Sequence, residues 1–147
     1  MLATTPSRAH WATLALTVTT VELALTTAYI HLTLGGVLFT LNAIGYAVLA
    51  AALAIGAIPH PLISRFSWLP RVGLAGFTAV TIGAYLVVGP YFSLGWVAKA
   101  VEVAILTLLA ADVVRVYGSL GGLVRAATST FDGHGRTPIR AAGATNR

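Results

Sequence analysis

The chain has 147 residues, of which 57% are hydrophobic and only 9% are charged, and it carries a formal net charge of +5. Soluble domains carry roughly 25% charged residues, so this composition indicates a protein that uses lipid as its solvent. The absence of cysteine excludes disulfides, thiolate metal sites and cysteine redox chemistry. Nearly all the arginines lie at the ends of apolar segments or in the C-terminal segment, where cations orient membrane proteins, so the charge excess does not indicate nucleic-acid binding.

Four apolar segments are long enough to cross a bilayer, which takes about 20 residues in a helix. The predicted spans cover residues 11–34, 36–58, 70–91 and 94–117. A short N-terminal stretch, residues 1–10, precedes the first span. That span contains Glu22 and is not followed by a clean cleavage site, so we interpret it as a retained helix rather than as a signal peptide.

The connections between the predicted spans differ in length. Gly35 and Gly36 predict a tight turn after the first span, and the sequence GPYFSLGW joins the third and fourth spans as closely. The middle loop is longer and contains helix-breaking prolines. The predicted fold is therefore an all-α integral membrane protein, a four-transmembrane-helix bundle built from two helical hairpins over residues 11–117. Residues 118–147 are rich in Gly, Thr and Arg and predict a flexible basic tail.

The arginines fall on one side of the predicted membrane. They are Arg8, Arg65, Arg71, Arg115, Arg125, Arg136, Arg140 and Arg147. The two short turns on the opposite side contain no arginine. By the positive-inside rule, both termini and the middle loop are expected in the cytoplasm, which predicts a multi-pass protein of the inner (plasma) membrane.

The first span carries a stripe of polar side chains around a carboxylate. The helical spacing puts on one face Thr19, Glu22, Thr26, Tyr29 and Thr33. An ionisable side chain near the bilayer centre costs about 2.5–3.5 kcal/mol on insertion scales, so we expect this face to point into protein. Two interpretations of Glu22 remain open: an ion or proton site, or a hydrogen-bonded carboxyl group that locks the helices together.

His31 lies half a turn away from Glu22, on a second polar face of the same span. We hypothesise that this face contacts another protein chain. Two copies of His31 across such an interface could hold haem or a pigment, whereas one chain cannot, because His10, His60 and His134 lie outside the spans. No other cofactor and no metal site is predicted, since no two histidines have metal-ligand spacing.

The fourth span carries three further charged residues. Lys99 and Glu102 are spaced i and i+3, which predicts an intrahelical ion pair. Asp112 is followed three residues later by Arg115, which predicts a second pair near the cytoplasmic interface. Helical rise places polar groups from every span in the outer half of the membrane. This predicted cluster comprises Glu22, Asn42, Tyr85, Lys99 and Glu102.

The sequence contains no nucleotide-binding loop, nucleophilic triad or carboxylate-rich metal motif, so no catalytic residue is predicted and an enzyme is not favoured. We interpret the chain as a non-catalytic accessory or structural subunit of a larger membrane complex. One alternative is a small oligomeric transporter of ions, protons or solutes that uses Glu22, Lys99 and Glu102. A second alternative is a haem- or pigment-binding subunit that uses His31. The expected partners are the bilayer and either other membrane subunits or further copies of the chain.

Overall fold

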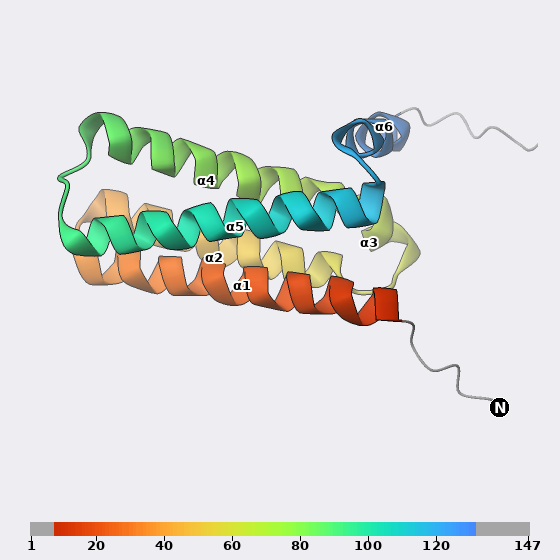
Figure 1. The fold of residues 1–147 in the computed structure, drawn as a ribbon, viewed down its shortest axis with the longest axis horizontal. Helices are drawn as coiled ribbons and strands as arrows, with labels where there is room; N and C mark the ends of the chain where they lie inside the picture. The colour runs from red at the N-terminus through yellow and green to blue at the C-terminus, as the bar shows by residue number, and fades with distance from the viewer. Residues whose placement is uncertain (1–7, 132–147) are drawn as a thin grey trace, which may run out of the picture.

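The computed structural model describes residues 8–131, and over this part of the chain it contains six helices and no strand (Figure 1). The helices are α1 (Arg8–Leu34), α2 (Val37–Gly56), α3 (Pro61–Arg65), α4 (Trp68–Val88), α5 (Ser93–Tyr117) and α6 (Leu120–Phe131). The four long helices begin and end within a few residues of the predicted spans. Sequence predictions that concern residues 1–7 and 132–147 lie outside the described residues.

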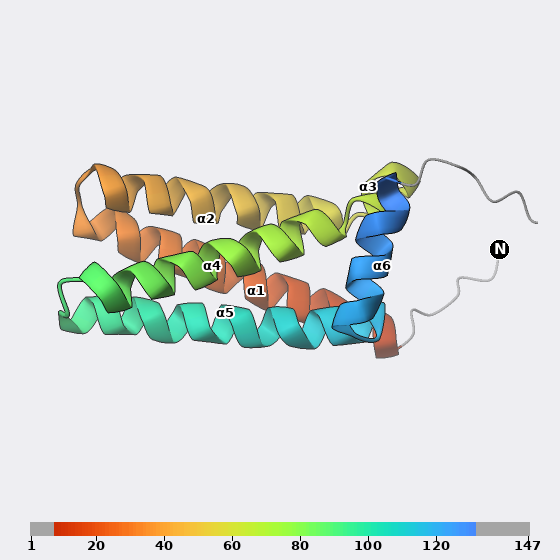
Figure 2. The same ribbon diagram turned by 90° about the horizontal axis from the view of Figure 1, so that it is seen from above.

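Three of the helices are long and apolar enough to cross a membrane, namely α1 from Trp11, α2 and α4. Helix α5 has 25 residues, which is about 38 Å at the helical rise, but it carries four charged side chains that lower its hydropathy. Figures 1 and 2 show α5 running lengthwise along the same axis as the other long helices, beside α1, with α4 nearest to it at the start of α5.

Three of the four charged residues of α5 are turned inward, and the fourth, Arg115, is exposed in the last turn. Lys99, Glu102 and Asp112 are all buried, whereas Val103 and Val114 on the outward side are more than half exposed. The surface that α5 presents to its surroundings is therefore much more apolar than its composition suggests. This division is possible because the charged positions lie close to one helical face.

The helices pack in a ring in which α1 contacts α2 and α5, and α4 contacts α2 and α5. Small residues make the α1 to α2 contact close, since Ala24 and Ala50 are fully buried there. Helix α4 runs obliquely, from the end of α2 to the start of α5 (Figure 2). Where α4 diverges from α2, the cavity described below lies between the α1–α2 and α4–α5 pairs.

Local sequence explains the turns. Gly35 and Gly36 have φ angles of 70° and 85°, a region that favours glycine, and they reverse the chain between α1 and α2. Helix α3 was not predicted. It begins because His60 caps the Leu62 amide through its side chain and Pro61 occupies the first helical position.

Part of the segment predicted as a flexible tail is a helix. Helix α6 lies across the end of the long helices near the start of α1 (Figure 2). Arg65 Nη2 donates to the Thr130 carbonyl at 2.5 Å, and Trp68 Nε1 donates to Thr130 Oγ1 at 3.2 Å. The ring of Phe131 also packs edge-on against Trp68. These contacts to α3 and α4 fix the position of α6, and they are tertiary contacts that composition does not reveal.

A buried ion pair joins α4 to α5 at the end of the long helices where α6 lies. Arg71 Nε donates to Asp112 Oδ2 at 2.7 Å, and both side chains are about 95% buried or more. The predicted pairing of Asp112 with Arg115 is therefore wrong. Arg115 instead donates to Thr13 on α1. Three residues along a helix bring two side chains near each other, but the inward position of Asp112 favours the buried guanidinium of the neighbouring helix.

This ion pair yields a stability prediction. Removing one partner of a buried pair leaves an uncompensated charge, so Arg71→Leu alone should destabilise the protein by about 3–5 kcal/mol. The double variant Arg71→Leu with Asp112→Leu should recover most of that loss. Thermal unfolding in detergent of the wild type, both single variants and the double variant measures this coupling. Single variants as stable as the wild type would contradict the buried pair.

Candidate functional site

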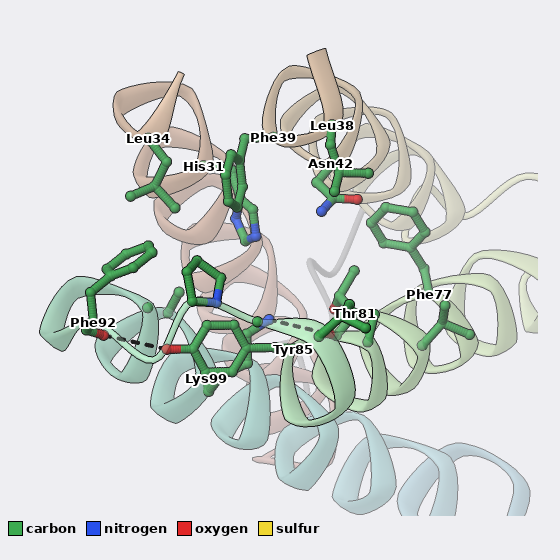
Figure 3. A pocket seen from close by; sticks show the side chains of 17 residues that line it. His31, Leu34, Leu38, Phe39, Asn42, Phe77, Thr81, Tyr85, Phe92 and Lys99 are labelled. Carbon is green, nitrogen blue, oxygen red and sulfur yellow. Dashed lines mark hydrogen bonds between the residues drawn. The ribbon is translucent and has the colours of Figure 1, made fainter. Parts of the chain in front are cut away.

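A cavity of about 250 Å³ lies between the α1–α2 and α4–α5 pairs, near the Gly35 and Gly36 turn (Figure 3). Most of its wall is apolar, with side chains such as Leu38, Phe77 and Phe92. Its polar lining residues are His31, Asn42, Thr81, Tyr85 and Lys99. An apolar pocket with a few convergent polar groups is the common form of a small-molecule site.

The lysine on this wall belongs to a buried ion pair. Lys99 Nζ donates to Glu102 Oε2 at 2.5 Å, as the sequence predicted from the spacing, and it also donates to the Thr81 carbonyl at 3.3 Å. The ammonium group lies 5.4 Å from the ring centroid of Tyr85, within range of a cation–π interaction. The charge of Lys99 is thus balanced by Glu102 while the side chain remains on the cavity wall.

A chain of hydroxyl groups leads to the same carboxylate from the other helices. Thr81 Oγ1 lies 3.1 Å from Glu102 Oε2 and 2.7 Å from the Tyr46 hydroxyl. A threonine hydroxyl has one proton. The Thr81 proton has two acceptors, the Thr78 carbonyl at 2.9 Å and Glu102 Oε2 at 3.1 Å. With that proton directed to either one, Tyr46 donates to Thr81 Oγ1. The contacts therefore connect Tyr46 on α2, through Thr81 on α4, to Glu102 on α5.

His31 reaches the cluster from α1, and its tautomer follows from its contacts. Its Nδ1 lies 2.7 Å from the Thr27 carbonyl oxygen, which can only accept, so Nδ1 carries a proton. Its Nε2 lies 3.8 Å from Glu102 Oε1. In the neutral ring this nitrogen presents a lone pair to a carboxylate oxygen, which is an arrangement with no attractive contact.

Glu102 Oε1 takes no part in these hydrogen bonds. The residue is 0% exposed, and this oxygen has no hydrogen-bond partner among the described residues. A buried polar atom without a partner costs roughly 1–3 kcal/mol, and more when it is charged. A proton on Oε1 or on His31 Nε2, or a water between them, would remove that cost. A proton or a water in the gap between these two atoms would therefore give Oε1 a partner.

The structure brings together most of the cluster predicted from sequence. Tyr85, Lys99 and Glu102 are in contact or adjacent, and Asn42 lies on the wall of the same cavity. Glu22 does not join them, because it is exposed on the outer face of α1.

The predicted interface position of His31 is reversed in the structure. The half-turn separation from Glu22 holds, but His31 is 3% exposed and points inward, while Glu22 points outward. Sequence establishes that two faces oppose each other but not which one is internal. The ring of His31 packs near Tyr46 and Phe39 within its own chain, so it is not presented to a second copy.

Two members of the network were missed in the sequence. Thr81 lies four residues before Tyr85, and with Thr78 it forms a polar stripe on one face of α4. Tyr46 lies four residues after Asn42 on α2. Helical spacing from the predicted residues was therefore the signal that could have found both. In the part of the chain that the structure describes, no group of three or more His, Cys, Asp or Glu side chains could hold a metal ion.

Comparison of the chain with family models, with curated proteins and with solved structures found no match.

The packing of Tyr85 against α5 gives a prediction with a matched control. A Cβ at Gly95 would lie 2.4 Å from the Tyr85 hydroxyl, whereas a Cβ at Gly83 meets nothing within 4 Å. Gly83→Ala should therefore stabilise the helix by about 0.5–1 kcal/mol. Gly95→Ala should destabilise the protein and displace the Tyr85 ring from Lys99. Thermal unfolding and near-ultraviolet circular dichroism compare the two, and equal effects would refute this packing.

Proposed function

We propose that the protein is a small proton-linked transporter of the inner (plasma) membrane. In this proposal α1, α2, α4 and α5 form a four-transmembrane-helix bundle of two hairpins, with both termini in the cytoplasm. The inward position of the α5 charges supports a fourth span, since the outward side of that helix is apolar. The arginines on the α3 and α6 side support the orientation, because cations favour the cytoplasmic side.

The observation that carries the proposal is the partnerless Glu102 Oε1 facing His31 Nε2 at 3.8 Å. In the neutral state of the cluster, Lys99 and Glu102 balance each other. When a proton binds at Oε1, the carboxyl group becomes neutral and Lys99 loses its ionic partner. Since Lys99 lies on the cavity wall, its ammonium group is then available to an anion in the cavity. Proton uptake and anion binding therefore favour each other.

This coupling defines the substrate class. The cavity offers one cation, the amide of Asn42 and a mainly apolar wall. These groups fit a small organic anion with an apolar body, such as a short-chain or aromatic carboxylate. A proton and a monoanion entering together add no net charge to the membrane interior, which keeps the cost of burial low.

A second cavity, of about 350 Å³, supports passage through the protein rather than binding at one end only. It lies near the start of α1, and its lining combines apolar side chains with hydroxyl groups and with Arg71, the partner of Asp112. One oxygen of Asp112 is also buried without a partner among the described residues. Buried Ile105 and Leu109 lie between Glu102 and Asp112 along α5, so an apolar layer separates the two polar regions.

Infrared difference spectroscopy of the protein in bilayers tests the proton site directly. Acidification should produce the carbonyl band of a protonated carboxyl group, and Glu102→Gln should remove that band. Glu22→Gln is the matched control, because Glu22 is a carboxylate on α1 that lies outside the cluster. This substitution should leave the band in place. A band unchanged by Glu102→Gln would refute the proposal.

Transport itself is tested with proteoliposomes that contain a pH-sensitive dye. Short-chain carboxylates applied together with a pH gradient should give internal acidification above that of empty vesicles, with no net current because the transported pair is neutral. Lys99→Met should reduce the apparent affinity for the anion at least about tenfold, which corresponds to about 1.4 kcal/mol. Glu22→Gln should leave transport unchanged. Equal proton entry with and without carboxylate in the wild type would contradict coupling.

A further inference from the structure

The outer face of α1 carries a polar seam that faces away from the rest of the protein. Its exposed members are Thr19, Glu22, Thr26, Tyr29 and Thr33. Their spacing alternates between three and four residues, which is the seam of a left-handed helix pair and the usual packing of transmembrane helices. Exposed Val18, Leu25 and Leu32 flank the seam. The face therefore has the pattern of a helix-packing surface although no helix of this chain covers it.

Glu22 lies at the middle of this seam and near the middle of α1, about 18 Å from the Leu34 end at the helical rise. The hydroxyl of Thr26 is satisfied by the Glu22 main-chain carbonyl at 2.8 Å. The Glu22 carboxylate itself has no hydrogen bond or ion pair to any of residues 11–131. In lipid such a group costs about 2.5–3.5 kcal/mol, so a partner that pairs with it removes part of that cost.

A second copy of this chain does not offer that partner. Among the described residues of the four long helices, Lys99 and Arg71 are buried within their own chain. Arg115 is exposed but lies in the last turn of α5, at the opposite end of the membrane from the Leu34 end and well away from the depth of Glu22. Contact of two α1 seams would place Glu22 against Glu22. The charge that complements this seam must therefore come from a different protein.

We propose that the α1 seam docks a transmembrane helix of another protein that carries a lysine or arginine near the middle of the bilayer. The cation pairs with Glu22, and the threonines and Tyr29 of the seam line the contact. This surface lies on the opposite side of α1 from His31 and is independent of the proton-linked site. It makes the protein a subunit of a hetero-oligomeric membrane assembly.

Energy transfer in vesicles tests the docking surface. The chain has no cysteine, so a single cysteine introduced at Ser93, an exposed residue, carries the donor dye. The acceptor is a leucine-rich transmembrane peptide with one central lysine, compared with the same peptide carrying a central leucine. The lysine peptide should associate more strongly, and Glu22→Gln should weaken that association about three- to tenfold, the size of one interhelical polar contact in membranes.

A relocated carboxylate is the matched control. The double variant Glu22→Leu with Val103→Glu keeps one exposed carboxylate in the membrane but moves it from the seam to α5. Binding of the lysine peptide to this variant as strongly as to the wild type would contradict docking at the seam. Energy transfer between copies of the protein that Glu22→Gln abolishes would also overturn the proposal, in favour of a homodimer. Equal binding of the lysine and leucine peptides would exclude charge pairing altogether.

Discussion

The burial of the Glu102 carboxylate is the constraint around which the interior is arranged. A charged group away from water is tolerated only when other groups compensate it. Lys99 on α5 and Thr81 on α4 contact Glu102 Oε2. Tyr46 on α2 hydrogen-bonds Thr81, and His31 on α1 faces Oε1 without a hydrogen bond. The contribution is uneven, because Oε2 has two donors and Oε1 has none among the described residues. This unevenness is the observation on which the proposed proton site rests.

The same helix, α1, takes part in two different interactions. Its inner face carries His31 and supports the cluster, whereas its outer face carries Glu22 and has no neighbour in the chain. Both faces contain threonines whose hydroxyls bond back to the helix, as Thr20 and Thr26 do to residues four positions earlier. These bonds satisfy hydroxyls locally in lipid or protein, so threonine alone does not mark the buried face. The ionisable residues do distinguish the two faces, because His31 is buried within its own chain whereas Glu22 is exposed.

The helices and the local pair of Lys99 and Glu102 could be predicted because both depend on residues near in sequence. Apolar length predicts a helix, and a spacing of three residues predicts a contact. The rotation of each helix could not be predicted, since α1 is polar on both sides, and Glu22 and His31 were therefore placed the wrong way round. The pairing of Asp112 with Arg71 rather than Arg115 depends on how α4 crosses α5. Helix α6 is stabilised by Arg65 and Trp68, which lie far from it in the sequence.

The central claim is that α5 crosses the bilayer with its charges inward and its apolar side toward lipid. Nitroxide labels on single cysteines at exposed Val103 and buried Ala98 test it, and the absence of native cysteine leaves no background. Paramagnetic relaxation in bilayers by oxygen, which concentrates in lipid, and by a water-soluble nickel chelate distinguishes the environments. The label at Val103 should be accessible to oxygen and shielded from nickel, and that at Ala98 shielded from both. A label at Val103 that is accessible to nickel would place α5 outside the membrane and contradict the account.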